Sequence, residues 1–182
     1  YAFDIGPGNC LINEWGRNNS NKKFDKNGEL ANAGKIDQLI LNQAIDNFKI
    51  NSYSQSLDIK NFDVSFARGL SLEDGCATIT DFTAYWIAEG LKHISQKNNV
   101  IFLLCGGGRK NSYLINCIKN YISKENNITL EIIDNYNLKG DYIESQAFAF
   151  LAIRSFLNLP ISFSATTGCK DFTVGGKLVK NF

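Results

Sequence analysis

The sequence lacks methionine, has a single histidine and two prolines, and carries almost no net charge in 182 residues. Nineteen basic against 18 acidic residues give +1, which leaves no strong field to attract nucleic acid or a membrane surface. No uninterrupted apolar run reaches the ~18 residues that a membrane-spanning helix needs. At 44% hydrophobic residues, the composition excludes a disordered chain and predicts a compact domain.

The single histidine limits the kinds of catalytic and metal site, and the absence of methionine bears on where the chain starts. His93 follows a helical pattern, so we expect a surface or capping role, and a multi-histidine metal site or a serine–histidine triad is disfavoured. Because the chain starts at Tyr1, inside what reads as a strand, we expect it to be the C-terminal part of a longer protein.

The five cysteines argue against a disulfide scaffold. They are odd in number, show no CxxC spacing and stand partly among apolar residues, at positions 10, 76, 105, 117 and 169. We therefore predict buried free thiols in a protein of the reducing cytoplasm.

Strand-like and helix-like patterns alternate along the chain, which predicts an α/β fold. The apolar run at 100–105 predicts a central strand covered on both faces. Ser71-Leu72-Glu73-Asp74 predicts a capped helix start. The other expected strands are 1–5 and 129–133, with a short strand or hairpin near Gly175-Gly176. The other expected helices start near Asn9, Ile36, Asn111 and Gly140, and Asn9 and Asn111 are the expected N-caps of theirs.

Three loops at the ends of expected elements carry the candidate chemistry. The first is Phe3-Asp4-Ile5-Gly6-Pro7-Gly8-Asn9, which places a carboxylate and glycines between a strand and a helix. Gly6 and Gly8 let a phosphate approach the backbone, and Asp4 could hold a metal ion or accept a proton. The alternative is a turn in which Asp4 only ends the strand.

The second loop is Cys105-Gly106-Gly107-Gly108-Arg109-Lys110-Asn111, between a buried strand and a helix. Three glycines remove the side chains where a flat ring or a phosphate could lie against the backbone, and they are entropically costly for a mere connection. The loop matches neither the dinucleotide fingerprint nor the Walker pattern. A tight strand-to-helix turn is the alternative.

The third loop is Gly140-Asp141-Tyr142-Ile143-Glu144. Asp141 followed three residues later by Glu144 has the form of a capping box, which alone would explain both carboxylates. Both would still face the sheet edge of the other two loops. We expect the nearby Phe148 and Phe150 to belong to the core.

Together and in this order, these stretches resemble the C-terminal half of anhydro-N-acetylmuramic acid kinases. The resemblance runs along the whole chain and rests on residues 2–9, Arg68-Gly69-Leu70-Ser71-Leu72-Glu73-Asp74-Gly75, 105–108 with Asn111, Gly140-Asp141, Glu144-Ser145-Gln146-Ala147-Phe148-Ala149, Leu159-Pro160 and Thr166-Thr167-Gly168. It implies that residues 1–182 form a single C-terminal nucleotide-binding lobe of the actin–hexokinase (ribonuclease H-like) type, a mixed sheet with flanking helices.

The resemblance also implies an activity, peptidoglycan recycling in the cytoplasm. ATP, with Mg²⁺, and water would convert 1,6-anhydro-N-acetylmuramate to N-acetylmuramate 6-phosphate in a cleft shared with an N-terminal lobe. Asp4 would be the general base, Glu144 would help to hold the sugar, and Gly6, Gly8, Gly106, Gly107, Gly108 and Asn111 would border the nucleotide. Metal ligands are not assigned, a homodimer is left open, and neither nucleic acid nor membrane is an expected partner.

One departure from the family pattern leaves an alternative open. Where relatives commonly read Pro-Pro-Lys-Ser-Leu-Asp-Arg, this chain has Tyr53-Ser54-Gln55-Ser56-Leu57-Asp58-Ile59, without either basic residue. A split or decayed remnant that keeps the fold as a non-catalytic binding domain is therefore the second hypothesis. An unrelated nucleotide-binding module is the third.

Overall fold

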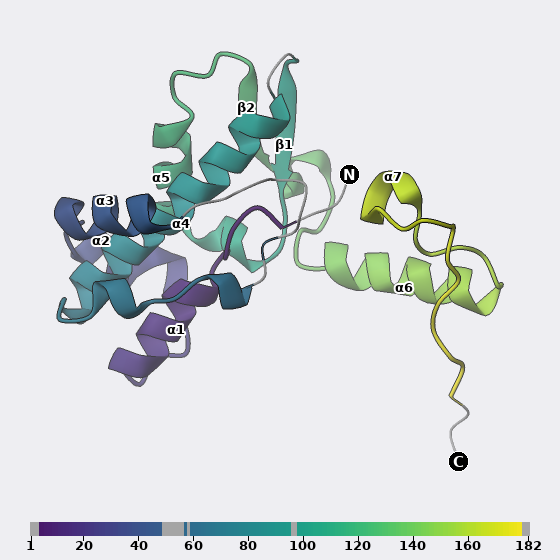
Figure 1. The fold of residues 1–182 in the computed structure, drawn as a ribbon, viewed down its shortest axis with the longest axis horizontal. Helices are drawn as coiled ribbons and strands as arrows, with labels where there is room; N and C mark the ends of the chain where they lie inside the picture. Colours follow the sequence, from purple (N-terminus) through teal and green to yellow (C-terminus); the bar gives the residue numbers. More distant parts are fainter. Residues whose placement is uncertain (1–3, 49–56, 58, 96–97, 180–182) are drawn as a thin grey trace.

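The computed structural model describes residues 4–48, 57, 59–95 and 98–179 (Figure 1). The elements, with 3-10 helices marked η, are α1 (Cys10–Asn19), η1 (Lys26–Gly28), α2 (Glu29–Ala33), α3 (Gln38–Asn47), η2 (Ile59–Asn61), η3 (Ser65–Ala67), α4 (Leu72–Ser95), β1 (Val100–Leu104), η4 (Gly107–Lys110), α5 (Ser112–Tyr121), β2 (Ile128–Ile132), η5 (Ile133–Tyr136), α6 (Ile143–Phe156) and α7 (Ser164–Thr167).

The sheet has two parallel strands in the described part of the chain. β1 pairs with β2 from Val100 opposite Ile128 to Leu104 opposite Ile132, and α5 makes the crossover between them. This confirms the α/β class, while the larger mixed sheet is not seen there. Residues 1–3 of the expected first strand lie outside the described residues, and Asp4 and Ile5 that follow are not in a strand.

One face of β1 is open, so the expectation of a strand covered on both faces is wrong. Phe102 and Leu104 pack towards α4 and α5, whereas Ile101 and Leu103 on the other face remain 56% and 41% exposed. A continuous apolar run cannot distinguish these cases, since both faces of the strand carry similar side chains. Because β1 and β2 are parallel, their carboxyl ends, at Leu104 and Ile132, still lie at the same edge of the sheet.

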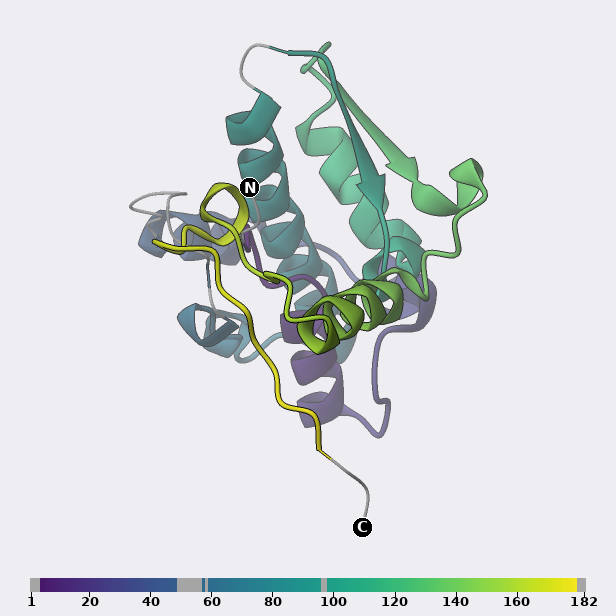
Figure 2. The same cartoon turned by 90° about the vertical axis from the view of Figure 1, so that its right-hand side faces the viewer.

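Helix α4 organises the interior and runs beside α5 (Figure 2). It begins as predicted, since the Ser71 Oγ accepts the Asp74 N–H at 3.0 Å. One side of α4 packs with α1, α2 and α3 around Leu11, Ile12 and Leu41, and the other packs with α5 around Leu114 and Ile118. These two apolar clusters hold in place the helices and strands that the loops at the strand ends connect.

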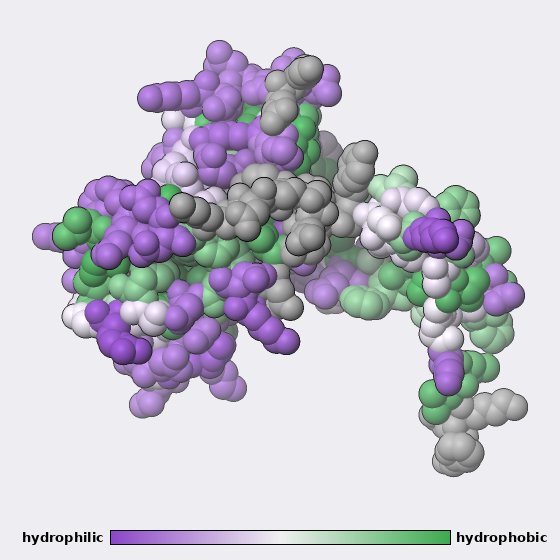
Figure 3. Space-filling model, in the orientation of Figure 1, coloured by the Kyte–Doolittle hydropathy of each residue, from purple (hydrophilic) through white to green (hydrophobic). Residues whose placement is uncertain are grey.

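Helix α6 is apolar but lies apart from these clusters (Figure 1). None of its residues is buried, and Phe148 and Phe150 are 65% and 59% exposed, so the prediction that they belong to the core is wrong. Figure 3 shows apolar surface over this helix. Near the C-terminus, a single antiparallel bridge joins Ser162 to Thr173 in place of the expected strand at Gly175.

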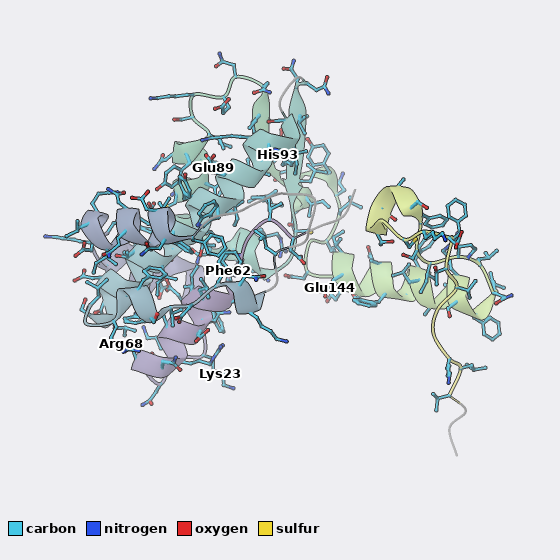
Figure 4. All side chains as sticks on the ribbon, in the orientation of Figure 1. Lys23, Phe62, Arg68, Glu89, His93 and Glu144 are labelled. Atoms are coloured by element: carbon cyan, nitrogen blue, oxygen red, sulfur yellow. The ribbon has the colours of Figure 1, made fainter. Side chains whose placement is uncertain are left out.

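The cysteines and the histidine complete the comparison. All five thiols are free, and burial raises the pKa of both Cys76 and Cys117 to about 12. Cys10 and Cys105 are exposed, so burial was predicted wrongly for them. His93 is exposed in the last turn of α4 (Figure 4), near the edge where β1 begins. None of the described helices is both long and apolar enough to cross a membrane.

Candidate functional site

The three predicted loops meet at the carboxyl edge of the two strands. A Cβ placed on Gly108 would lie 3.7 Å from the Asn9 amide nitrogen, which brings the first loop against the second. The Gly106 N–H donates to the Gly140 carbonyl at 3.0 Å, which joins the second loop to the third. The sequence-based expectation that these segments share one edge is thus confirmed for the parts described.

The first loop turns into α1 through backbone hydrogen bonds. The Cys10 N–H donates to the Pro7 carbonyl at 3.1 Å, and Gly8 has a φ of 55°. Asn9 is at the N-cap position, but its side chain makes no capping bond, so that prediction is wrong. Its Oδ1 is buried without a hydrogen-bond partner in the structure. The Asn9 amide instead faces Gly108, which makes it part of the contact between loops.

Asp4 lies at the open side of this loop. Its side chain is exposed, and its carbonyl accepts the Leu57 N–H at 3.1 Å. Leu57 comes from the stretch that departs from the family pattern, most of which (53–56 and 58) lies outside the described residues. The departing segment therefore contacts the backbone of the residue that the sequence marks as the candidate base.

The triple-glycine loop presents bare backbone to solvent. Gly106 has φ 71° and ψ −173°, a conformation essentially confined to glycine. A Cβ on Gly106 or Gly107 would have no other atom within 4 Å, so space lies above both residues. This space would admit a flat ring or a phosphate against the backbone, and the nucleotide contact stays a prediction.

Arg109 holds the loop in place through a network that the sequence did not reveal. Its Nε and Nη2 donate to the Asp134 carboxylate at 2.6 and 3.2 Å. Its Nη1 donates to the Asp141 Oδ1 at 2.7 Å and to the Gly106 carbonyl at 2.8 Å. Lys110 also pairs with Asp141 at 2.8 Å. Asp134 lies 25 residues from Arg109 and belongs to no motif, so no local signal marks it.

These ion pairs set the protonation of the carboxylates. Hydrogen bonds from Arg109 and then from Lys110 lower the pKa of Asp141 to about 2. The Arg109 hydrogen bond likewise lowers the pKa of Asp134. The same two partners, Asp134 first, raise the pKa of Arg109. Asp134 and Asp141 are therefore ionised at neutral pH, and the Arg109 guanidinium lies between them.

The third loop does not form the predicted capping box. Helix α6 starts at Ile143 with Tyr142 at the N-cap and no side-chain capping bond, while Asp141 pairs with Arg109 and Lys110. Ion pairing across the fold has displaced the local cap. Glu144 is exposed in the first turn of α6, where the helix leaves the rest of the molecule (Figure 4).

Asn111 is positioned as a helix cap. Its Oδ1 accepts the Leu114 N–H at 3.0 Å, as predicted, and the residue is only 5% exposed. A Cβ on Gly28 would lie 2.4 Å from this oxygen, so the asparagine packs tightly against η1. Asn111 thus supports the glycine loop from below, whereas Asp4 and Glu144 face solvent.

The same edge offers few ligands for a metal ion. Among the described residues, no group of three or more His, Cys, Asp or Glu side chains is arranged to hold one. Asp134 and Asp141 are both engaged by Arg109. The arrangement instead combines an exposed carboxylate, Asp4, with open glycine backbone and a second carboxylate, Glu144, on the neighbouring helix.

Comparison with known proteins identifies the family of the chain. The sequence model of the family described as "Anhydro-N-acetylmuramic acid kinase" matches residues 1–181. A protein of that name from Pelagibacter ubique is 51% identical over 186 residues, covering all of this chain and 49% of the relative. Those from Rhizorhabdus wittichii and Rhizobium rhizogenes are 36% and 33% identical, over 96% and 98% of this chain and 47% of each relative. The chain thus spans about half the length of these curated relatives.

Proposed function

Because the chain belongs to the anhydro-N-acetylmuramic acid kinase family, we propose that it is the C-terminal, nucleotide-binding lobe of such a kinase. The lobe would have the actin–hexokinase (ribonuclease H-like) form and act in the cytoplasm, in peptidoglycan recycling. The observation that carries the proposal is the junction of three loops at one strand edge, through Asn9 with Gly108 and Gly106 with Gly140. Exposed free thiols at Cys10 and Cys105 fit a reducing compartment.

The proposed reaction uses 1,6-anhydro-N-acetylmuramate, ATP and water. Water attacks the anomeric carbon, the bond from that carbon to O6 breaks, and O6 takes the γ-phosphoryl group, so that ADP and N-acetylmuramate 6-phosphate leave. Asp4 accepts the proton that the water loses, which its exposed position beside Gly6 allows. Glu144, exposed at the start of α6, holds sugar hydroxyls.

The nucleotide would lie over Gly106, Gly107 and Gly108, with its phosphates towards Gly6, Gly8 and the first turn of α1. The open space above Gly106 and Gly107 supports this placement. The N-terminus of this ten-residue helix adds a partial positive charge that favours an anion. Asn111, buried beneath the loop, would border the nucleotide only through the backbone that it supports.

Mg²⁺ would be held mainly by the phosphates of ATP. The carboxylates of Asp134 and Asp141 are engaged by Arg109, and Asp4 is an exposed acidic residue in the first of the loops that surround the proposed phosphates. Mg²⁺ commonly keeps several waters and binds through one or two carboxylates plus substrate phosphates. When bound, the ion would neutralise charge on the transferred phosphoryl group.

A second lobe is part of the proposal. Helix α6, which bears Glu144 in its first turn, exposes Phe148, Phe150 and Phe156, each at least 59% accessible. Exposed apolar surface of this extent is typical of a face that another protein region covers. We assign that cover to the other half of the kinase, which would also complete the cleft around the γ-phosphate.

The experiment uses this chain joined to the other half of the fold, as in its longer relatives. Asp4→Asn should fold and bind ATP normally but lose at least ~100-fold in turnover, because an amide cannot accept the proton. Glu144→Gln should keep ATP affinity and lose sugar affinity.

Two results would contradict the proposal. An Asp4→Asn protein within a few-fold of the parent rate would make Asp4 a turn residue. Equal inactivity of the parent and both variants, with folding intact, would favour the remnant without turnover, the hypothesis raised by the change at 53–59.

A further inference from the structure

Arg109 is almost completely covered, although it lies in a loop at the molecular surface. Its side chain is 6% exposed, while its partners Asp134 and Asp141 are 43% and 47% exposed. Such coverage of a guanidinium, with three of its nitrogens hydrogen-bonded, indicates a fixed position. A surface salt bridge that forms by chance would leave the long side chain free in solvent.

We propose that Arg109 is a positioning residue for the nucleotide: it fixes the triple-glycine loop and cancels the charge of two carboxylates beside the phosphates. The inference rests on the proposed nucleotide site. It adds a residue that does not itself touch the nucleotide but determines how the loop presents its backbone.

Hydrogen bonds hold the Gly106 backbone on both sides. The Arg109 Nη1 donates to the Gly106 carbonyl at 2.8 Å, and the Gly106 N–H donates to the Gly140 carbonyl at 3.0 Å. These two bonds hold both polar groups of a glycine whose backbone could otherwise take many conformations. Gly107 follows Gly106 directly, so the orientation of its exposed backbone also depends on the Arg109 hydrogen bond.

Gly140 completes the clamp because it allows the arginine to approach. A Cβ on Gly140 would lie 2.4 Å from the Arg109 Nε and 2.8 Å from the Asp134 Oδ2. Any larger residue would push the guanidinium off the carboxylate. The clamp therefore needs a glycine at the third loop and an arginine at the second, which gives the Gly140 of the family-like motif a physical role.

The electrostatic part concerns the sign of the charge near the loop. Asp134 and Asp141 are both ionised and about half exposed, close to the backbone where an anionic nucleotide would bind. Arg109 and Lys110 balance them. Without Arg109 the network would carry a net negative charge, which repels phosphates more than it affects an uncharged nucleoside.

The test measures the affinity of the 182-residue chain for ATP and for adenosine, by NMR titration at low and high salt. The variants are Arg109→Lys, Arg109→Met and Arg109→Met combined with Asp134→Asn and Asp141→Asn. Arg17→Met, on the exposed end of α1, is the matched control. Thermal unfolding of each protein reports whether it folds.

We expect Arg109→Met to weaken ATP binding about tenfold or more and adenosine binding less, with the difference shrinking at high salt. The triple variant should recover the salt-dependent part of the loss, because it removes the uncompensated carboxylates. Arg109→Lys should lie between, since it keeps the charge but loses the two-pronged contact with Asp134.

Three outcomes would overturn the inference. ATP affinity of a folded Arg109→Met equal to that of the parent and of the Arg17 control would remove the role altogether. Equal losses for ATP and adenosine, with no recovery in the triple variant, would make Arg109 a structural staple. If the parent binds ATP no better than a denatured control, the proposed nucleotide site fails, and this inference fails with it.

Discussion

Gly107→Ala tests the open backbone of the glycine loop with a single methyl group. In the structure, a Cβ at this position meets no atom within 4 Å, and the residue does not have the positive φ of Gly106. The added methyl should therefore fit without strain. By reducing the freedom of the unfolded chain it should leave stability unchanged or raise it by about 0.4–1 kcal/mol.

The same methyl should interfere with a ligand. It projects about 1.5 Å beyond the Cα, so a ring lying on the loop would be displaced by roughly that distance. A gap of even 0.5–1 Å forfeits a quarter to a half of each contact, and a stacked ring makes about 10–20 contacts of ~0.1–0.2 kcal/mol. The loss is on the order of 1 kcal/mol, which corresponds to about five- to tenfold in affinity.

The assay compares ATP affinity by NMR titration with unfolding in urea. Gly16→Ala in α1, where an added Cβ also has open space, is the matched control and should raise stability by about 0.5–1 kcal/mol without affecting nucleotide. ATP affinity in Gly107→Ala equal to that of the parent would refute the reasoning that this open face receives a ligand.

Three further results are expected. Asp25, 6% exposed, accepts the N–H groups of the first two residues of α2 after Glu29, so Asp25→Ala should lower the free energy of unfolding in urea by about 1–3 kcal/mol, and Asp25→Asn by less. Because the folded pKa of Asp141 is about 2, below its ordinary value, stability should rise with pH between about 2 and 4, and Asp141→Asn should flatten that rise in acid titrations. Iodoacetamide at pH 8 should modify the exposed cysteines and spare Cys76 and Cys117, as read by mass spectrometry.

Local chemistry made part of the fold predictable. Ser71 and Asn111 accept N–H groups three residues later, and both helices begin where those caps predict. The glycine loop was recognisable because strand, glycines and cap follow one another directly. In each case the interacting groups are neighbours in sequence, so the pattern contains the interaction.

Asp141 shows where this reasoning fails. Its sequence context has the form of a capping box, yet in the fold a guanidinium 32 residues away competes for the carboxylate. Two cations, Arg109 and Lys110, hold this carboxylate away from the helix end, so the helix begins at Ile143 without a side-chain cap. The proximity of the three loops was predictable, but the contacts within them depend on residues that only the folded chain brings together.

Helix α6 exposes large apolar residues on more than one side. Its exposed apolar residues Phe150, Ile153 and Phe156 are spaced by three and lie along one stripe, whereas Phe148 lies on another side of the helix. One neighbouring element would cover only a single stripe of such a helix. The open face of β1 is a second apolar surface. Burial of α6 therefore requires neighbours on more than one side. Because Glu144 is in the first turn of α6, the way in which the second lobe packs against this helix would also affect the position of the candidate sugar-binding residue.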